Sequence, residues 1–261
     1  MLVQTIQLFH LQVNFNLCFL VFFSTICGYN FHYFLASLYI QKHFSASFLW
    51  QQKIRVIFFF VGAVGVVIFL LPSQVNIWLL LLASIFTGLY SLPLLPVKLP
   101  AFIRSTGFIK TLLLAFTWTF VTAYLPMHQA GVNVTATFSI LLLFQRFIFM
   151  LLLCLLFDCR DSATDKKIGL HSLATDLKPK LIQLIIYSLF GLLCMVSLFL
   201  FKNGISFLVT VALFILNGIC LLVYNISLQK RGYIFYYFLV DGLMILSALL
   251  TGLAGILING F

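Results

Sequence analysis

The sequence predicts an all-α integral membrane protein, a bundle of about eight transmembrane helices. Of its 261 residues, 63% are hydrophobic and only 8% are charged, and the mean hydropathy is +1.17. This leaves too little polar surface for a water-soluble domain. Apolar runs near 20 residues long recur along the chain, which is typical of membrane-spanning helices. The period-two alternation of a membrane β-barrel is absent, and only helices or closed barrels can span lipid.

Eight apolar segments account for the predicted bundle: 11–36, 56–71, 77–95, 108–125, 135–157, 181–201, 205–226 and 234–259. The second is near the lower limit of length for a span. The opening stretch MLVQTIQLFH is too short to cross a membrane, and it lacks the basic region of a cleavable signal peptide. With no internal repeat and no soluble appendage, residues 1–261 are expected to form a single transmembrane domain.

The connectors between these segments alternate sharply in charge, and this predicts the topology. Four connectors are basic, with the residues Lys42, Lys53 and Arg55; Lys98, Arg104 and Lys110; Arg160, Lys166, Lys167, Lys178 and Lys180; and Lys230 and Arg231. The intervening connectors 72–76, 126–133 and 202–204 are nearly free of basic residues. The positive-inside rule then places the basic connectors in the cytoplasm and both termini outside.

This distribution also identifies the surroundings of the protein. The net charge of +10 lies in short connectors and not on a soluble face, so it indicates membrane lipid and no nucleic-acid partner. The predicted location is a bacterial cytoplasmic membrane, with the acidic stretch 157–177 on the cytoplasmic face.

Three of the five carboxylates of the chain follow one apolar segment at spacings i, i+3 and i+7: Asp158, Asp161 and Asp165. On a continued helix they lie within roughly 60° of one another. Like charges on one face repel and need a compensating cation, and Mg²⁺ suits carboxylate oxygens shared with phosphates. The neighbouring Arg160, Lys166 and Lys167 could meet remaining phosphate charge. The alternative is a solvated loop whose acids merely offset its lysines.

The wider pattern D-x-x-D-x-x-x-D-x-x-x-G-x-x-S, from Asp158 through Gly169 to Ser172, resembles the second aspartate-rich motif of the UbiA superfamily of intramembrane prenyltransferases. YSLPLLPVKLP at 90–100, followed by Arg104 and Lys110, looks like the Tyr-Pro-Lys segment of that family. GYIFYYFLVDGL at 232–243 fits the last helix of some members. Only the acidic motif is specific by itself.

The resemblance implies a nine-helix fold around a cavity open to lipid, here with the first helix truncated. It implies Mg²⁺-dependent transfer of an isoprenyl group from an isoprenyl diphosphate to an aromatic or other lipophilic acceptor. Asp158, Asp161 and Asp165 would be the catalytic, metal-binding residues. The residues expected to bind the substrate are Asn30, Lys98, Arg104, Lys110, Arg160 and Lys166. Metal and basic groups would stabilise the departing pyrophosphate.

The first aspartate-rich motif of the family, N-x-x-x-D-x-x-x-D, is degenerate here. Asn30 matches, but Phe34 and Leu38 stand at the aspartate positions, and no acid precedes Asp158. The alternative to an enzyme is therefore a catalytically inactive UbiA-like protein that binds isoprenoid lipid or scaffolds a membrane complex. A transporter is disfavoured, because neither repeats nor paired broken helices are present. The short N-terminus fits either a real deletion or a misassigned start codon.

Two further charges fall inside apolar segments, Arg146 and Asp241. Arg146 lies roughly 18 Å along a helix from Asp158, and Asp241 lies roughly 15 Å from Arg231, so their depths are similar. An unpaired charge in the bilayer is costly, which predicts a structural ion pair between them. The alternative is a substrate-facing role for either residue.

Overall fold

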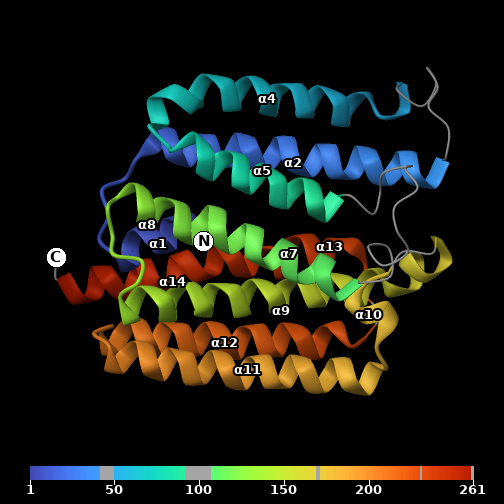
Figure 1. The fold of residues 1–261 in the computed structure, drawn as a ribbon. Coiled ribbons are helices and arrows are strands. Elements are labelled where there is room, and N and C mark those ends of the chain that lie inside the picture. Colours follow the sequence, from blue (N-terminus) through green and yellow to red (C-terminus); the bar gives the residue numbers. More distant parts are fainter. Residues whose placement is uncertain (42–49, 92–106, 169–170, 230, 260–261) are drawn as a thin grey trace. The chain divides into compact units, whose positions relative to one another are not determined.

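The structure, a computed structural model, describes residues 1–261 except 42–49, 92–106, 169–170, 230 and 260–261. All regular structure in the described part is helical, and seven of its helices are long and apolar enough to cross a membrane (Figure 1). A shorter apolar helix covers Ile77–Ser91. These observations confirm the all-α membrane class. The chain divides into two compact units, and the predicted single domain stays a prediction.

Unit 1 comprises Met1–Gln12, Gly107–Lys167 and His171–Phe261. Its helices are α1 (Leu2–Leu8), α7 (Gly107–Thr119), α8 (Leu125–Gln129), α9 (Thr137–Ile168), α10 (Leu173–Asp176), α11 (Pro179–Lys202), α12 (Phe207–Ser227), α13 (Tyr233–Phe235) and α14 (Gly242–Asn259). The last residue of α9 belongs to unit 2 in the division of the chain. α11 packs on α12, α12 on α14, and α1 on α14.

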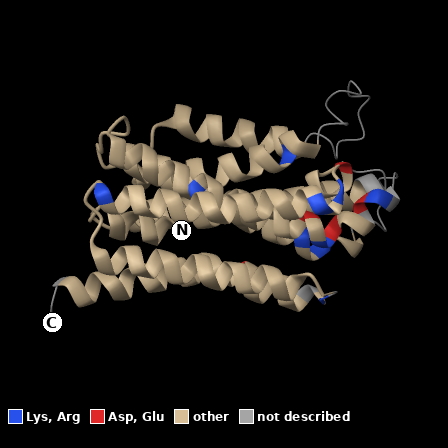
Figure 2. Ribbon diagram, turned by 90° about the horizontal axis from the view of Figure 1, so that it is seen from below, with Lys and Arg blue, Asp and Glu red and all other residues tan. Residues whose placement is uncertain are grey.

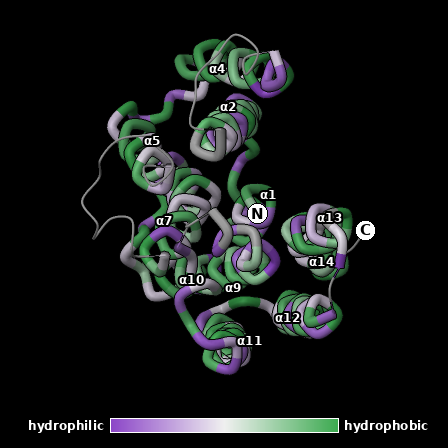
Figure 3. The backbone as a smooth tube through the Cα atoms, turned by 90° about the vertical axis from the view of Figure 1, so that its right-hand side faces the viewer, coloured by the Kyte–Doolittle hydropathy of each residue, from purple (hydrophilic) through white to green (hydrophobic). Residues whose placement is uncertain are grey.

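The core of unit 1 is built around α9. Its middle turns supply an almost continuous run of buried apolar side chains from Ile148 to Leu156. The apolar side chains on the outer faces of α11 and α14 are exposed instead, among them Leu184, Leu198 and Ile245. Figure 3, with many helices seen nearly end on, shows hydrophobic residues all around these helices. Apolar faces both inside and outside are what a bundle surrounded by lipid requires.

Two wide turns interrupt helices of unit 1. Residues Phe120–Tyr124 form the π-helix η2 between α7 and α8, and Tyr236–Val240 form the π-helix η3 between α13 and α14. A π-turn frees backbone groups from the regular helical pattern and often marks a functional position. The Thr122 carbonyl, within η2, accepts a hydrogen bond from Thr5 Oγ1 of α1 at 2.9 Å.

Unit 2 contains α2 (Phe15–Gln41), α4 (Lys53–Ser73) and α5 (Ile77–Ser91). α2 packs along α4 through a close backbone approach: a Cβ added at Gly62 would lie 2.7 Å from the Cys27 nitrogen. Small residues permit such contact between membrane helices. α2 also contacts α5, where His32 stacks on the Tyr90 ring with centroids 4.5 Å apart.

Each of the eight predicted apolar segments corresponds to a helix or a run of joined helices. The largest difference is at α9, which continues to Ile168 although its apolar segment ends at 157. The short N-terminal stretch forms α1, which is not among the spans. It is nonetheless interior, because the Gln4 and Thr5 side chains are buried.

Candidate functional site

Most charged residues of unit 1 gather at one end of the bundle, around the end of α9 and the neighbouring α10 (Figure 2). Because α9 continues beyond its apolar part, Asp158, Asp161 and Asp165 all lie on one unbroken helix. The helical spacing on which the predicted metal-binding face depends is therefore present.

Asp158 is anchored to α7. Its Oδ2 accepts a hydrogen bond from Thr111 Oγ1 at 2.6 Å, while the same hydroxyl lies 3.3 Å from the Gly107 carbonyl. Lys110, beside Thr111 in the chain, interacts electrostatically with both Asp158 and Asp165. The first turn of α7 thus supplies a hydroxyl and a cation to the acidic face of α9.

Asp161 is held by its chain neighbour. Arg160 Nε donates to Asp161 Oδ1 at 2.7 Å and Arg160 Nη2 donates to Oδ2 at 2.6 Å. The guanidinium carbon also lies 4.9 Å from the Phe157 ring, 5.3 Å from Tyr236 and 5.1 Å from Tyr237. An arginine is well ordered when its guanidinium stacks on aromatic rings and also makes a bidentate hydrogen bond to a carboxylate. Arg160 therefore ties the acidic face of α9 to η3.

Asp165 is half-buried, one residue before the exposed Lys166. Burial raises the pKa of the Asp165 carboxyl; Lys110 opposes that rise, and the nearby Asp161 adds to it. A divalent cation bound here would favour the charged carboxylate and relieve the repulsion from Asp161. The mutual repulsion of the Asp161 and Asp165 carboxylates is what a cation bound at this face would relieve.

The carboxylate oxygens fit Mg²⁺ by chemistry. Among the residues the structure describes, no three His, Cys, Asp or Glu side chains converge on one point. Mg²⁺ does not require this, because it is usually held by one or two carboxylates together with water and substrate phosphates. Asp158, Asp161 and Asp165 are the residues from which one or two would bind the ion directly, with the remainder acting through water.

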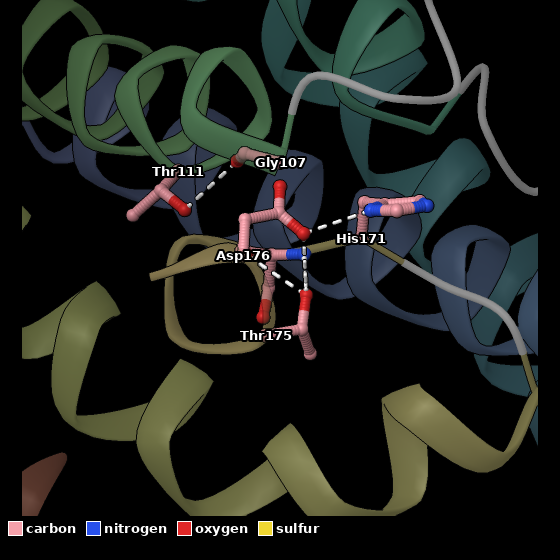
Figure 4. A network of polar contacts seen from close by, with 6 residues as sticks. Gly107, Thr111, His171, Thr175 and Asp176 are labelled. Carbon is pink, nitrogen blue, oxygen red and sulfur yellow. Dashed lines mark hydrogen bonds and ion pairs between the residues drawn. The ribbon is translucent and has the colours of Figure 1, made fainter. Parts of the chain in front are cut away.

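The segment after the acidic motif packs directly on the start of α7. A Cβ added at Gly107 would lie 2.5 Å from backbone atoms of Ser172, so only glycine fits there. Thr175 Oγ1 accepts a hydrogen bond from the Ser172 amide at 2.8 Å and so braces the first turn of α10. His171 Nδ1 lies 2.8 Å from Asp176 Oδ1 (Figure 4). These hydrogen bonds are local to residues 171–176, and the close approach of Gly107 to Ser172 is what brings α10 against α7.

Three other residues are predicted to bind the substrate: Asn30, Lys98 and Arg104. Asn30 belongs to unit 2, where its Nδ2 donates to the Ile26 carbonyl of its own helix at 2.8 Å. Lys98 and Arg104 lie outside the described residues. Of the predicted set, the structure brings Lys110 and Arg160 together with the carboxylates.

The predicted Arg146–Asp241 ion pair is not formed in this structure. Arg146 Nη1 donates to Gln4 Oε1 of α1, whereas the cation that interacts with Asp241 is Arg160. Arg160 lies fourteen residues further along α9, roughly 21 Å from Arg146. The prediction measured depth from Asp158 as though the helix ended there. Since α9 runs on to Ile168, Asp241 lies near the charged end of the bundle and Arg146 lies deep inside.

Sequence reasoning missed several residues that shape the site. Thr111, Gly107 and the two tyrosines of η3 contact motif residues from distant parts of the chain. Only Gly107 offered a signal, since a glycine at the start of an apolar helix can mark close packing. Comparison with known proteins finds no match: no family model matches the chain, and neither does any curated protein or solved structure.

Proposed function

We propose that this protein is a UbiA-like membrane prenyltransferase that binds an isoprenyl diphosphate, with Mg²⁺, at the acidic end of α9. The observation that supports the proposal best is the arrangement of Asp158, Asp161 and Asp165 on one continuous helix at the end of a membrane span. A soluble phosphorylated headgroup and a lipid-dissolved chain would meet at such a boundary.

The residues of the chain have distinct roles in this proposal. Asp158, Asp161 and Asp165 would hold the metal, which when bound supplies positive charge to the diphosphate. Lys110 interacts electrostatically with two of these carboxylates and would add a fixed cation on the α7 side. Thr111 keeps Asp158 oriented through its 2.6 Å hydrogen bond. Cations preorganised around a leaving pyrophosphate stabilise its developing charge.

A second function is favoured by one specific observation. The chain has no acid before Asp158, and the positions of the first aspartate-rich motif hold Phe34 and Leu38. Ionisation of the diphosphate benefits from charge stabilisation on both of its sides. The second candidate is therefore a protein of the same type that binds the isoprenyl diphosphate without transferring its chain.

Binding of farnesyl diphosphate to the purified protein in nanodiscs, with Mg²⁺ or with EDTA, tests the shared part of both proposals. We expect metal-dependent binding that Asp158→Ala and Asp161→Ala each weaken by about tenfold or more, the scale for losing a charged partner. Asp165→Ala should be milder if that carboxylate acts through water on a partly hydrated ion.

The matched control is Asp176→Ala, which removes a carboxylate of α10 that bonds His171 and lies outside the motif. It should leave affinity unchanged. Metal-independent binding that the Asp158 and Asp161 variants retain would reduce the acidic stretch to a charged connector and end the prenyltransferase proposal.

A further inference from the structure

The side chain of Arg146 is fully buried inside unit 1, within the membrane-spanning part of α9. Its Nη1 donates to Gln4 Oε1 and lies 3.6 Å from Met1 Sδ, both from the α1 segment. Its Nε and Nη2 have no hydrogen-bond partner among the described residues. A buried cation with two idle donors is a costly arrangement unless something else completes it.

No acidic side chain of the chain completes it. The sequence has five aspartates and no glutamate, and all five are described. Within that described part, the ion pairs of these aspartates are Arg160 with Asp161 and His171 with Asp176. The carboxylate predicted as the partner, Asp241, interacts with Arg160. The compensating negative charge therefore has to come from outside these side chains.

The two unpartnered nitrogen atoms of Arg146 have a fixed geometry relative to one another. Nε and Nη2 form one edge of the planar guanidinium, the edge that binds both oxygens of a carboxylate at once. Arg160 in this same structure uses these two atoms to hold Asp161, at 2.7 and 2.6 Å. Arg146 presents the identical edge without a partner in the described residues.

Gln4, which bonds Arg146 through Nη1, adds a further donor without a partner among the described residues. Its Oε1 accepts from Arg146, which leaves its Nε2 as an amide donor, and Nε2 is likewise buried without a partner among the described residues. Two hydrogen-bonded side chains thus carry three unpartnered donor nitrogens and one positive charge in the buried interior of unit 1. Donors in excess of acceptors select an anion over water, which would need acceptors as well.

We infer that Arg146 and Gln4 form a buried anion site in unit 1 that takes a carboxylate group. The site is separate from the acidic face of α9, because Arg146 lies roughly 18 Å along the helix from Asp158. It does not depend on the proposed diphosphate chemistry. The carboxylate could arrive from water as a small ion or from the bilayer as a lipophilic acid, and the two sources are distinguishable.

The test is thermal unfolding of the full chain in detergent at constant ionic strength, with sulfate as the background anion. Sodium acetate, sodium decanoate and sodium chloride are titrated separately. We expect a saturable rise in Tm with the carboxylates and a smaller one with chloride, because a single chloride ion cannot form the two parallel N–H···O hydrogen bonds that a carboxylate makes with this edge. A lower half-saturation for decanoate than for acetate would support the site and identify the bilayer as the source; equal values would support it and identify water.

Two variants connect the response to these residues. Arg146→Gln should abolish the rise, and Gln4→Leu should raise the half-saturating carboxylate concentration about tenfold by removing one donor to a charged group. Arg231→Gln, a change at an exposed arginine, should respond as wild type does.

An equal rise in wild type and Arg146→Gln would overturn the site. If Arg146→Gln does not fold, an unchanged half-saturation in Gln4→Leu would contradict it independently. A larger rise with chloride than with either carboxylate would overturn the carboxylate assignment.

Discussion

Arg160 donates two hydrogen bonds, of 2.7 and 2.6 Å, to the carboxylate of Asp161, the next residue in the chain. Arg160 occupies one lone pair on each oxygen of this carboxylate, so a metal ion that needs those positions competes with the guanidinium. Binding of Mg²⁺ at those positions and release of Arg160 would therefore be one event. The released guanidinium would remain among aromatic rings and near Asp241.

Arg160→Lys should destabilise the metal-free protein by about 1–3 kcal/mol, the scale for hydrogen bonds to charged groups. Lysine keeps the charge but cannot fork onto Asp161 or stack flat on the rings of Phe157 and Tyr236. The measurement is the unfolding transition in detergent. Arg231→Lys, at an exposed position, is the control. Equal stability of the two variants would show that the Arg160 contacts contribute nothing measurable.

Gly107→Ala should destabilise unit 1 by about 1–3 kcal/mol, the usual cost of forcing an extra atom into a packed site. The new Cβ would meet the Ser172 backbone at 2.5 Å, and backbone cannot rotate away as a side chain can. Gly191→Ala is the matched control, because that helical position of α11 has nothing within 4 Å. Gly107→Ala should lower the Tm of thermal unfolding. Gly191→Ala should leave the Tm unchanged or raise it, since alanine favours a helix more than glycine does. Identical shifts would mean that α7 and α10 are not in contact.

Asp165 should make the metal-free protein less stable as the pH rises. Burial raises the pKa of this carboxyl in the folded chain above its unfolded value. Its contribution to stability is thus complete below the unfolded pKa and is lost as the pH rises through the folded pKa. Asp165→Asn should flatten this dependence when unfolding is followed in EDTA across that window. Added Mg²⁺ should reverse the trend in wild type, because a ligand carboxylate must be ionised. If the stability of Asp165→Asn depends on pH as steeply as that of wild type, the titrating group is not Asp165.

The acidic end of α9 should face the cytoplasm. A cysteine introduced at Ala163, exposed just after the apolar part of α9, should react only with reagents that reach the inner face. Asn203→Cys, in the connector after α11, should react only from the outside. Both are made in a variant without the six native cysteines. Labelling of Ala163→Cys from outside would reverse the orientation and remove the basis for a cytoplasmic diphosphate.

Phe34→Asp should raise prenyl transfer above a slow or absent wild-type rate. The change restores one carboxylate of the degenerate first motif, which the resemblance places on the other side of the diphosphate. The measurement is product formation from farnesyl diphosphate with a set of aromatic acceptors. The control is Phe34→Asn, because asparagine has nearly the same size as aspartate but carries no charge. Equal rates for the two variants would show that the missing charge is not what limits turnover.

Hydropathy located the helices well because a segment that crosses the hydrocarbon core must be apolar along its whole length, which gives a long and recognisable run. It placed the end of α9 at 157, since it detects only the lipid-embedded part of a helix. The residues after Asp158 are polar yet continue the helix to Ile168. That extension aligned the three carboxylates as their spacing predicted, and it also displaced Asp241 from the depth of Arg146.

Contacts between distant segments could not be predicted in the same way. Nothing in the spacing of Thr111 indicates a bond to Asp158, because that contact depends on how α7 and α9 pack. The π-helices η2 and η3 have no recognisable pattern in the sequence. Gln4 lies in a stretch that is too short to cross a membrane, and the sequence gives no signal that it contacts Arg146. Its importance comes from the burial of α1 against α14.

The hydrogen bond from Thr5 to the Thr122 carbonyl has a consequence for the order of assembly. The wide turn that accepts the Thr5 hydroxyl is made more than a hundred residues after α1. α14, on which α1 also packs, is made later still. α1 therefore cannot complete its packing until both η2 and α14 have been made, so its docking is a late step in the assembly of unit 1.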